Sequence, residues 1–210
     1  MPYSPVAVNR RPWMLLLREG QYLALPWKNG GGITREIHRE PSDPAPFDWR
    51  LSLASIDRAG PFSAFPGYQR TLVLVRGAGV ELDFGAHGAA RLAQTGQSAT
   101  FDGGWPTHCR LIQGPSTDLN LIVSCSRAQS TARCMRLAAA EHIETAGWTE
   151  TLLCCLAGSI ELSNALGERG VLRDVEVARC FETDGVVTCQ PGTPAGASLF
   201  LASLRRRAPG

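Results

Sequence analysis

The segment WKNGGGITREI, residues 27–37, places three consecutive glycines between the basic residues Lys28 and Arg35. Successive glycine N–H groups can form a concave anion-binding site, because glycine adopts positive φ and lets another group approach the backbone closely. An arginine can hold a carboxylate through two parallel hydrogen bonds. The segment therefore predicts a carboxylate site. Its structural alternative is a tight turn that leads into a strand, with both basic side chains in water.

Arg35 belongs to the alternating segment ITREIH, in which it would share one face of a strand with Ile33 and Ile37. A half-buried arginine among aliphatic side chains requires an acidic or ligand partner. Asp102, Asp118 or a bound carboxylate could supply that partner, and the spacing does not choose among them.

The segment GPFSAFPGYQRTLVLV, residues 60–75, has two prolines and two phenylalanines before an apolar strand. Phe62 and Phe65 could wall an apolar pocket, and Ser63 and Arg70 could supply its polar contacts, as in many small-ligand sites. For each phenylalanine alone, a place in an ordinary β-core is the alternative.

Asp118 and Asn120 lie two residues apart in GPSTDLNLIV, opposite an apolar face that begins with Leu119 and Leu121. Alternate residues of a strand share one face. If that face points into a barrel, both polar side chains reach the same cavity. If it points outward, they are surface residues.

Metal and nucleotide chemistry is not indicated. The four histidines are His38, His87, His108 and His142, and they form neither an HxH pair nor a facial triad. The chain has no CxxC pair and no GxxxxGK[ST] loop. We therefore expect no metal and no other cofactor.

Strand signals dominate the chain. Runs such as WRLSLASI, RTLVLVRG, LNLIVSCS and TLLCCLAG are short and mostly bounded by turn residues. The best helical candidate is residues 133–146, and several cysteines, Cys125 among them, lie in apolar runs. The sequence predicts an all-β protein, as a sandwich or a barrel.

An internal repeat is visible at an offset of 80 residues, which brings TLVLVRGAGVEL at 71–82 onto TLLCCLAGSIEL at 151–162. The offset extends over some fifty residues, and we interpret it as two homologous β-units in tandem, residues 1–130 and 131–210.

At this offset the second unit loses most polar residues of the first. Arg70 meets Glu150, Asp118 meets Ser198, and Asn120 meets Phe200. A small-molecule site is therefore expected in the first unit, and a mainly structural role is expected for the second.

The overall charge excludes some partners. The formal net charge of +2 is too small to indicate binding to nucleic acid or to a membrane surface. The early apolar run WMLLL is too short for a signal-peptide core or a membrane span. We expect a cytoplasmic protein.

The sequence resembles the HutD/Ves family, cupin-like proteins associated with bacterial histidine utilisation. Four segments carry the resemblance: LPWKNGGGITREI, FDWRLSLASI, GPFSAFPGYQRTLVLVRGAGVEL and RLIQGPSTDLNLIV. They cover most of the first unit, and the second unit matches only in strand pattern and glycine placement. One departure is the stretch after DLN, where the family tends to continue with Met and two arginines and this chain reads LIVSCSR.

The resemblance implies a metal-free bicupin, two tandem cupin-like β-barrels, that binds an intermediate of histidine breakdown in a regulatory role. Urocanate and N-formylglutamate are the implied candidates, both small carboxylates, and no enzymatic reaction comes with the family. The binding residues carried over by motif position are Lys28, Asn29, Thr34, Arg35, Ser52, Phe62, Ser63, Phe65, Arg70, Asp118 and Asn120.

Two other functions stay open. An isomerase or hydrolase acting on a small carboxylate would need a positioned acid or base, for which Glu36, Asp102, Asp118 or His38 could serve. A protein-interaction module would instead expose a large apolar patch. Edge strands of a cupin often pair, so a homodimer is a further expectation.

Overall fold

The computed structural model describes residues 12–27, 30–42, 46–181 and 185–208, and the regular secondary structure there is almost entirely β-strand. Its elements are β1 (Met14–Leu17), η1 (Glu19–Gln21), β2 (Leu23–Pro26), β3 (Gly32–Glu40), β4 (Trp49–Ile56), β5 (Gly60–Pro61), β6 (Tyr68–Gly77), β7 (Val80–Asp83), η2 (Gly85–His87), β8 (Ala89–Leu92), β9 (Ser98–Asp102), β10 (His108–Leu111), β11 (Ser116–Ser124), β12 (Ala128–Leu137), β13 (Glu141–Glu144), β14 (Glu150–Ala157), β15 (Ser159–Asn164), β16 (Arg169–Arg173), β17 (Val177–Phe181), β18 (Val186–Pro191) and β19 (Ala197–Arg206). In these ranges no helix is long and apolar enough to cross a membrane.

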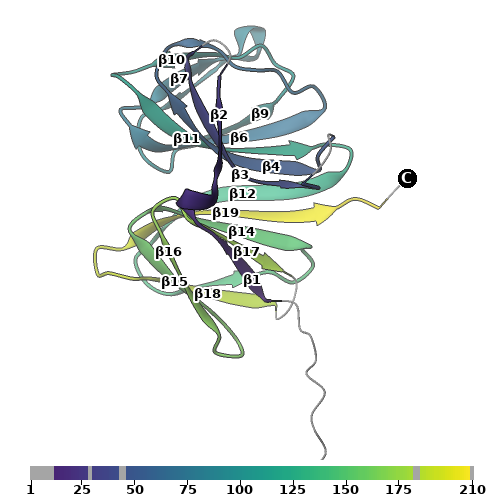
Figure 1. Ribbon diagram of the computed structural model, residues 1–210, viewed down its shortest axis with the longest axis vertical. Coiled ribbons are helices and arrows are strands. Elements are labelled where there is room, and N and C mark those ends of the chain that lie inside the picture. The colour runs from purple at the N-terminus through teal and green to yellow at the C-terminus, as the bar shows by residue number, and fades with distance from the viewer. Residues whose placement is uncertain (1–11, 28–29, 43–45, 182–184, 209–210) are drawn as a thin grey trace, which may run out of the picture.

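The strands form four sheets, two in each half of the molecule (Figure 1). The N-terminal unit, β2–β11, has a six-stranded sheet of order β2-β3-β4-β11-β6-β9 and a four-stranded sheet of order β5-β10-β7-β8. The C-terminal unit, β12–β19, has a sheet of order β1-β17-β14-β19-β12 and a second of order β13-β18-β15-β16. Strand β1 therefore pairs with the C-terminal unit, although the sequence interpretation assigned residues 1–130 to the first.

The two units repeat one strand order. The run β4-β11-β6-β9 of the first corresponds to β12-β19-β14-β17 of the second, and β5-β10-β7-β8 corresponds to β13-β18-β15-β16. Both pairs of sheets are arranged as stacked layers (Figure 1).

Three apolar clusters fill the molecule. One lies between the two sheets of the N-terminal unit and includes Leu72 and Leu82, and one lies in the C-terminal unit and includes Leu153 and Leu162. The third contains side chains of both units, among them Trp49, Leu121 and Phe200. Because each buried side chain of this size contributes about 1.5–3 kcal/mol, this central core holds the two units together.

The position of side chains relative to these cores corrects the alignment of the two units. An offset of 80 keeps Leu82 with Leu162, and both face their own unit's interior. It places Leu72 on Leu152, which faces the central core instead. The equivalent of Leu72 is Leu153, an offset of 81, because a shift of one residue turns a strand's side chains to the other face.

The corrected offset changes the counterparts of the polar residues. Strand pairing opposes Arg70 and Arg50 to Ile122, and in the second unit it opposes Thr151 and Thr131 to Ser203. The counterparts of Asp118 and Asn120 are accordingly Leu199 and Leu201, rather than Ser198 and Phe200. Thr151 rather than Glu150 replaces Arg70.

Two other expectations are wrong. Residues 133–146, the best helical candidate, form the end of β12 and all of β13, and β12 pairs along its whole length with β19. Tertiary pairing outweighs the local helical preference of an alanine-rich stretch. Cys125 is exposed in the turn after β11, whereas Cys154, Cys155, Cys180 and Cys189 are buried.

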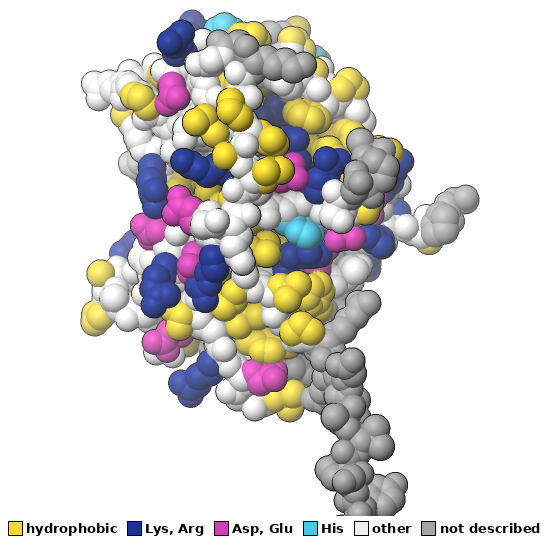
Figure 2. All heavy atoms as spheres, in the orientation of Figure 1, with side chains coloured by type: hydrophobic (Ala, Val, Ile, Leu, Met, Phe, Trp, Pro, Cys, Tyr) yellow, Lys and Arg dark blue, Asp and Glu magenta, His cyan; other side chains and the backbone are white. Residues whose placement is uncertain are grey.

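A buried ionic network joins the six-stranded and five-stranded sheets. Arg179 donates from Nε to Glu150 at 2.9 Å, and Glu150 also accepts from Trp49 Nε1 at 2.8 Å. The other end of the Arg179 guanidinium contacts His38 at 2.6 Å and Glu40 at 3.3 Å. Blue, magenta and cyan side chains gather at the waist of the molecule in Figure 2, between the two units.

Burial and the adjacent Arg179 cation lower the pKa of His38, so the imidazole in this network is neutral at neutral pH.

Candidate functional site

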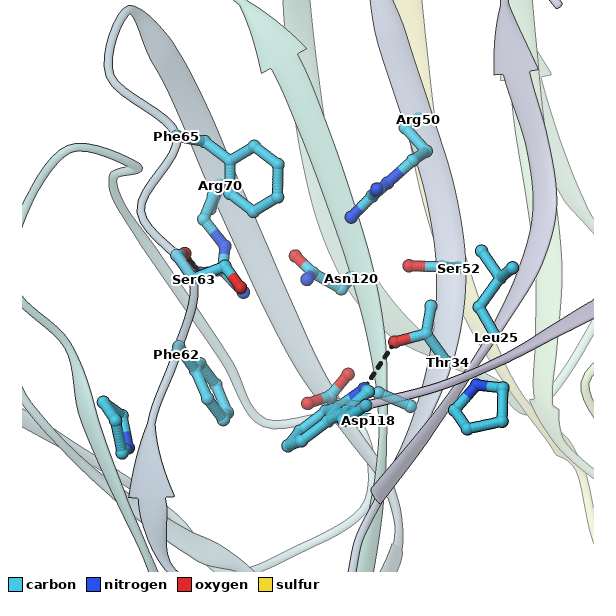
Figure 3. A pocket seen from close by; sticks show the side chains of 14 residues that line it. Leu25, Thr34, Arg50, Ser52, Phe62, Ser63, Phe65, Arg70, Asp118 and Asn120 are labelled. Carbon is cyan, nitrogen blue, oxygen red and sulfur yellow. Dashed lines mark hydrogen bonds between the residues drawn. The ribbon is translucent and has the colours of Figure 1, made fainter. Parts of the chain in front are cut away.

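A cavity of about 500 Å³ lies in the N-terminal unit, where the six-stranded sheet faces the segment between β5 and β6 (Figure 3). A volume of this size is typical of small-molecule sites. Its walls come from five strands of the six-stranded sheet, β2, β3, β4, β6 and β11, and from β5 and the connections that follow β2 and β5. The lining residues are Leu25, Pro26, Trp27, Thr34, Arg50, Ser52, Ala54, Pro61, Phe62, Ser63, Phe65, Arg70, Asp118 and Asn120.

Strand alternation directs the polar side chains into this cavity. On β4, Leu51 and Leu53 belong to the central core, while Arg50 and Ser52 line the cavity. Strand β11 repeats the pattern, with Leu119 in the central core and its neighbours facing the cavity. Each strand is thus apolar toward the other unit and polar toward its own interior.

Strand register arranges the polar side chains in three rows across the sheet. Arg50, Ile122 and Arg70 oppose one another across β4, β11 and β6 and form what we call the arginine row. Two residues further along, about 7 Å away, Ser52 opposes Asn120 in the amide row.

The third row, two residues further still, is the acid row. It contains Thr34, Ala54 and Asp118 on β3, β4 and β11. Figure 3 shows the arginine side chains at one end of the cavity, Ser52 and Asn120 in the middle, and Thr34 and Asp118 at the other end.

Arg70 is buried, with only 4% of its surface exposed. It donates from one terminal nitrogen to the Ser63 carbonyl at 3.2 Å, and its guanidinium lies 5.3 Å from the Phe62 ring centre and 5.6 Å from that of Phe65. Its Nε has no hydrogen-bond partner in the described part of the chain. Burial lowers the pKa of Arg70 to about 10, and the Asp118 carboxyl opposes that effect.

Arg50 is the second cation of the cavity. Its guanidinium lies 5.2 Å from the Phe65 ring centre and 5.6 Å from that of Phe47, so Phe65 lies between Arg50 and Arg70. Its buried Nε also lacks a partner among the residues described. Burial lowers the pKa of Arg50, while Glu36 nearby raises it. Both arginines are cations at neutral pH, and each has an Nε–H donor without a partner in the described part of the chain.

Asp118 is the buried acid of the cavity, with 2% of its surface exposed. Burial raises its pKa to about 7, and the Arg70 cation works in the opposite direction. Asp118 Oδ1 and Arg70 Nε both lack a hydrogen-bond partner in the described ranges. Asn120 Oδ1 is also buried and has no hydrogen-bond partner in the described ranges.

Aromatic side chains close the side of the cavity next to Asp118. Trp27 and Phe62 meet edge to face, with ring centres 6.0 Å apart. Trp27 Nε1 donates to Thr34 Oγ1 at 2.8 Å, which fixes the indole ring against β3. The cavity therefore combines a cationic end, an acidic end and a flat apolar wall.

Eight of the sequence-predicted residues line this cavity. They are Thr34, Ser52, Phe62, Ser63, Phe65, Arg70, Asp118 and Asn120. Lys28 and Asn29 lie outside the described residues.

Arg35 does not line the cavity. It opposes Leu53, which faces the central core, and therefore lies on the opposite face of β3 from Thr34. The expected face shared by Arg35 and Ile37 is thus the face toward the other unit.

Gly30 and Gly32 serve the backbone conformation, and neither lines the cavity. Gly30 has φ of +66° and closes a turn by donating to the Trp27 carbonyl at 3.0 Å. Gly32 packs directly against the Ser55 carbonyl, where a Cβ would collide. The structural alternative for this segment, a tight turn into a strand, describes these glycines.

Of the four candidate acids and bases, only Asp118 lines the cavity. His38 belongs to the ionic network between the units, and Asp102 accepts from the Gly104 N–H in a surface turn. Within the described ranges no three His, Cys, Asp or Glu side chains are grouped as metal ligands would be.

Sequence reasoning missed Arg50 and Trp27. Arg50 had a usable signal, since alternation in WRLSLASI sets Arg50 and Ser52 opposite the apolar Trp49, Leu51 and Leu53. Trp27 had none, because its position depends on the turn at Gly30.

The chain is similar to known proteins in sequence and in fold. The family model described as HutD matches residues 19–195. An uncharacterized 21.2 kDa protein in the hutC 3' region of Pseudomonas putida is 40% identical over 113 residues, which cover 53% of this chain and 59% of that protein. The chain therefore spans less than two thirds of this relative's length.

Two solved structures are similar over nearly the whole fold. HutD from Pseudomonas fluorescens SBW25 has a TM-score of 0.79 and 30% identity, covering 93% of this chain and 100% of its own. The conserved protein PA5104 from Pseudomonas aeruginosa PAO1 has a TM-score of 0.82, 27% identity and the same coverages. A cupin 2 conserved barrel domain protein from Leptotrichia buccalis, with a TM-score of 0.53 and 9% identity over 84% of this chain and 89% of its own, shares the fold alone.

Proposed function

The chain belongs to the HutD family, and on that premise we propose that it is a metal-independent small-molecule-binding protein of histidine utilisation. Its ligand is a small carboxylate intermediate of histidine breakdown, urocanate or N-formylglutamate, and binding serves to regulate the pathway. The binding site is the cavity that lies over β4, β11 and β6 of the six-stranded sheet. We further propose that the two units are tandem cupin-like barrels, an interpretation supported by the order of four strands that both large sheets share and by the matching order of the two smaller sheets.

One observation carries the proposal. Arg50 and Arg70 both line the cavity, and the buried Nε of each has no hydrogen-bond partner in the described part of the chain. A buried cation is costly unless it is paired, and the aromatic rings around these guanidiniums satisfy charge but accept no conventional hydrogen bond. A carboxylate is the group whose geometry fits an arginine donor pair.

A second candidate function is proton transfer on a bound carboxylate. The observation that favours it is Asp118, a buried carboxyl in a cavity whose pKa lies near neutrality, as is common for catalytic acids and bases. Incubation with urocanate or N-formylglutamate in heavy water tests it. Protein-dependent deuterium incorporation at carbon would support catalysis, and its absence at saturating ligand would exclude it for that compound.

The experiment that tests the binding function is calorimetric titration with urocanate, N-formylglutamate, histidine and glutamate. We expect saturable binding of urocanate or N-formylglutamate, and a loss of about 1.5–3 kcal/mol in Arg70→Gln, roughly ten-fold to over a hundred-fold in affinity.

Arg35→Gln is the matched control, because it removes an arginine from the other face of the same sheet. It should leave the affinity unchanged. An equal loss in both variants, or saturable binding that neither variant alters, would contradict the assignment of the cavity.

A further inference from the structure

The end of the cavity opposite the arginine row has a chemistry of its own. Asp118 is buried there, and its Oδ1 has no hydrogen-bond partner in the described part of the chain. A buried acceptor without a partner costs free energy comparable to a lost hydrogen bond, so its retention calls for an explanation. The explanation below rests on the proposed function, carboxylate binding in this cavity.

The arginine row and the acid row are separated along the sheet. Asp118 precedes Ile122 by four residues on β11, about 13 Å of extended chain. In Figure 3 the side chains of Arg50 and Arg70 lie at one end of the cavity and Asp118 at the other, with Asn120 and Ser52 between them. A carboxylate held by the arginines therefore has its other end beside Asp118.

The groups around Asp118 are mostly unable to donate to it. Ala54 on β4 and the aromatic rings of Trp27 and Phe62 offer apolar surface. The indole N–H of Trp27 donates to Thr34 Oγ1 and is therefore not available to Asp118. Cys109 on β10 is a buried thiol and only a weak donor, and its S–H is directed to the Arg110 carbonyl, 4.0 Å away.

The cation that acts on the pKa of Asp118 is that of Arg70, which lowers it. Asp118 Oδ1 is therefore a buried acceptor without a donor in the described part of the chain, and the Asp118 side chain lines the cavity.

We propose that the ligand of this cavity carries an N–H donor at the end remote from its carboxylate, and that Asp118 is the specificity residue that accepts from it. The ligand lies along β11, with its carboxylate on the arginine row and its N–H on the acid row. The flat wall of Trp27 and Phe62 accommodates a planar N–H group, such as a heteroaromatic ring or an amide. A carboxylate without this donor leaves Asp118 unpaired and binds more weakly.

Two synthetic probes isolate this donor. Pyrrolylacrylate and furylacrylate share the carboxylate, the chain length and the ring size, and they differ in whether the ring presents N–H or an oxygen acceptor. Neither ring titrates between pH 5.5 and pH 8.5. Calorimetric titration at pH 8, where Asp118 is ionised, should show the pyrrole acid binding at least about ten-fold more tightly than the furan acid.

Variants at one position separate recognition from folding. Asp118→Leu should bring the two affinities to a ratio of about one. Asp118→Asn keeps an acceptor oxygen and should retain part of the preference. In the wild type, the preference for the pyrrole acid should rise between pH 6 and pH 8, as the Asp118 carboxyl ionises. Asp118→Asn should abolish this rise, because an amide gains no charge in that range. Asp83→Asn, on an exposed carboxylate of β7, is the control and should behave as the wild type.

The outcomes distinguish this inference from the function on which it rests. Equal affinity of the two acids in the wild type would overturn the inference. So would a preference that survives in folded Asp118→Leu. If urocanate or N-formylglutamate binds and neither probe does, the inference falls while carboxylate binding stands. If none of the four compounds binds, both fall.

Discussion

The two units share a strand order over most of their sheets, but the interior of the N-terminal unit is polar and that of the C-terminal unit is apolar. At equivalent places in the sheet, the N-terminal unit has Arg50 and Arg70 where the C-terminal unit has Thr131 and Thr151. Asp118 and Asn120 likewise correspond to Leu199 and Leu201, which are buried in the apolar core of the second unit. The same framework thus surrounds a polar cavity in one unit and a packed core in the other.

This difference separates what the fold requires from what the site requires. The C-terminal unit shows that the strand order is satisfied by aliphatic interiors such as Leu153, Leu199 and Leu201. The polar rows of the N-terminal unit are therefore not needed for folding, and they contain donors and acceptors without partners among the described residues, Arg70 Nε and Asp118 Oδ1 among them. Buried groups of this kind lower stability, and sites of function are where proteins retain them.

The largest expected effect concerns the interface that the two units share. Arg179→Met leaves Glu150 buried without its cation and should lower the free energy of unfolding by about 3–5 kcal/mol. Arg76→Met is the matched control, since Arg76 and Asp174 also link the units but are exposed, and it should cost no more than about 1 kcal/mol. Urea denaturation measures both. Equal losses would show that the buried network has no special role.

The next effect is the loss of stability caused by burying the ionised Asp118 carboxyl, and this loss grows as the pH rises. Its pKa in the folded protein is about 7, above the ordinary value of 3.8. Between these values the folded state holds a proton that the unfolded state has released, so this group's contribution makes the protein less stable as pH rises.

Asp118→Asn lacks this contribution. Its stability relative to the wild type should therefore increase from pH 4 to pH 8, by up to roughly 4 kcal/mol. Denaturant unfolding of both proteins at several pH values measures the difference, in which the titrations of other groups cancel. A difference that is constant with pH would mean that Asp118 titrates normally.

A smaller change in the free energy of unfolding is expected when polar residues of the N-terminal interior are replaced by their apolar counterparts from the C-terminal unit. The double variant Asp118→Leu, Asn120→Leu installs the residues found at Leu199 and Leu201. Removing buried polar groups without partners should raise the free energy of unfolding by about 1–3 kcal/mol, while carboxylate binding is lost. Thermal unfolding and titration measure the two results. A less stable variant would show that the polar interior also supports the fold.

The smallest effect is in the second unit. Thr151 is fully buried and its Oγ1 has no partner in the described part of the chain, so Thr151→Val should stabilise the protein by about 1 kcal/mol. Thr71 is the contrasting residue, because its hydroxyl pairs with that of Thr100 at 2.9 Å. Thr71→Val should therefore destabilise by a similar amount, and a shift of the same sign in both variants would contradict the assignment.

Local periodicity predicted the strands and the faces of their side chains. The prediction that Asp118 and Asn120 share a face opposite Leu119 and Leu121 is confirmed, because the leucines lie in the central core and the polar pair in the cavity. The same alternation would have identified Arg50. These features depend only on the two-residue period of a strand.

Features that depend on long-range geometry were not predictable. The repeat was found at 80 residues, but strand pairing and core contacts give an equivalence of 81 on β4, β6 and β11, whereas β7 and β10 keep 80. Residues 133–146 have a helical composition that pairing with β19 overrides. For Arg35, the pattern gave its neighbours on the face but could not say which of two cores that face meets.

The central claim is that a carboxylate binds between Arg50 and Arg70, and the guanidinium N–H signals test it most directly. Arginine labelled with ¹⁵N at Nε, assigned through single Arg→Lys variants, can be followed by NMR during titration with N-formylglutamate and with urocanate. We expect the Nε–H resonances of Arg50 and Arg70 to shift downfield and become protected from exchange, while that of Arg35 is unchanged. Saturable binding that moves the Arg35 signal, or that moves neither cavity arginine, would contradict the account.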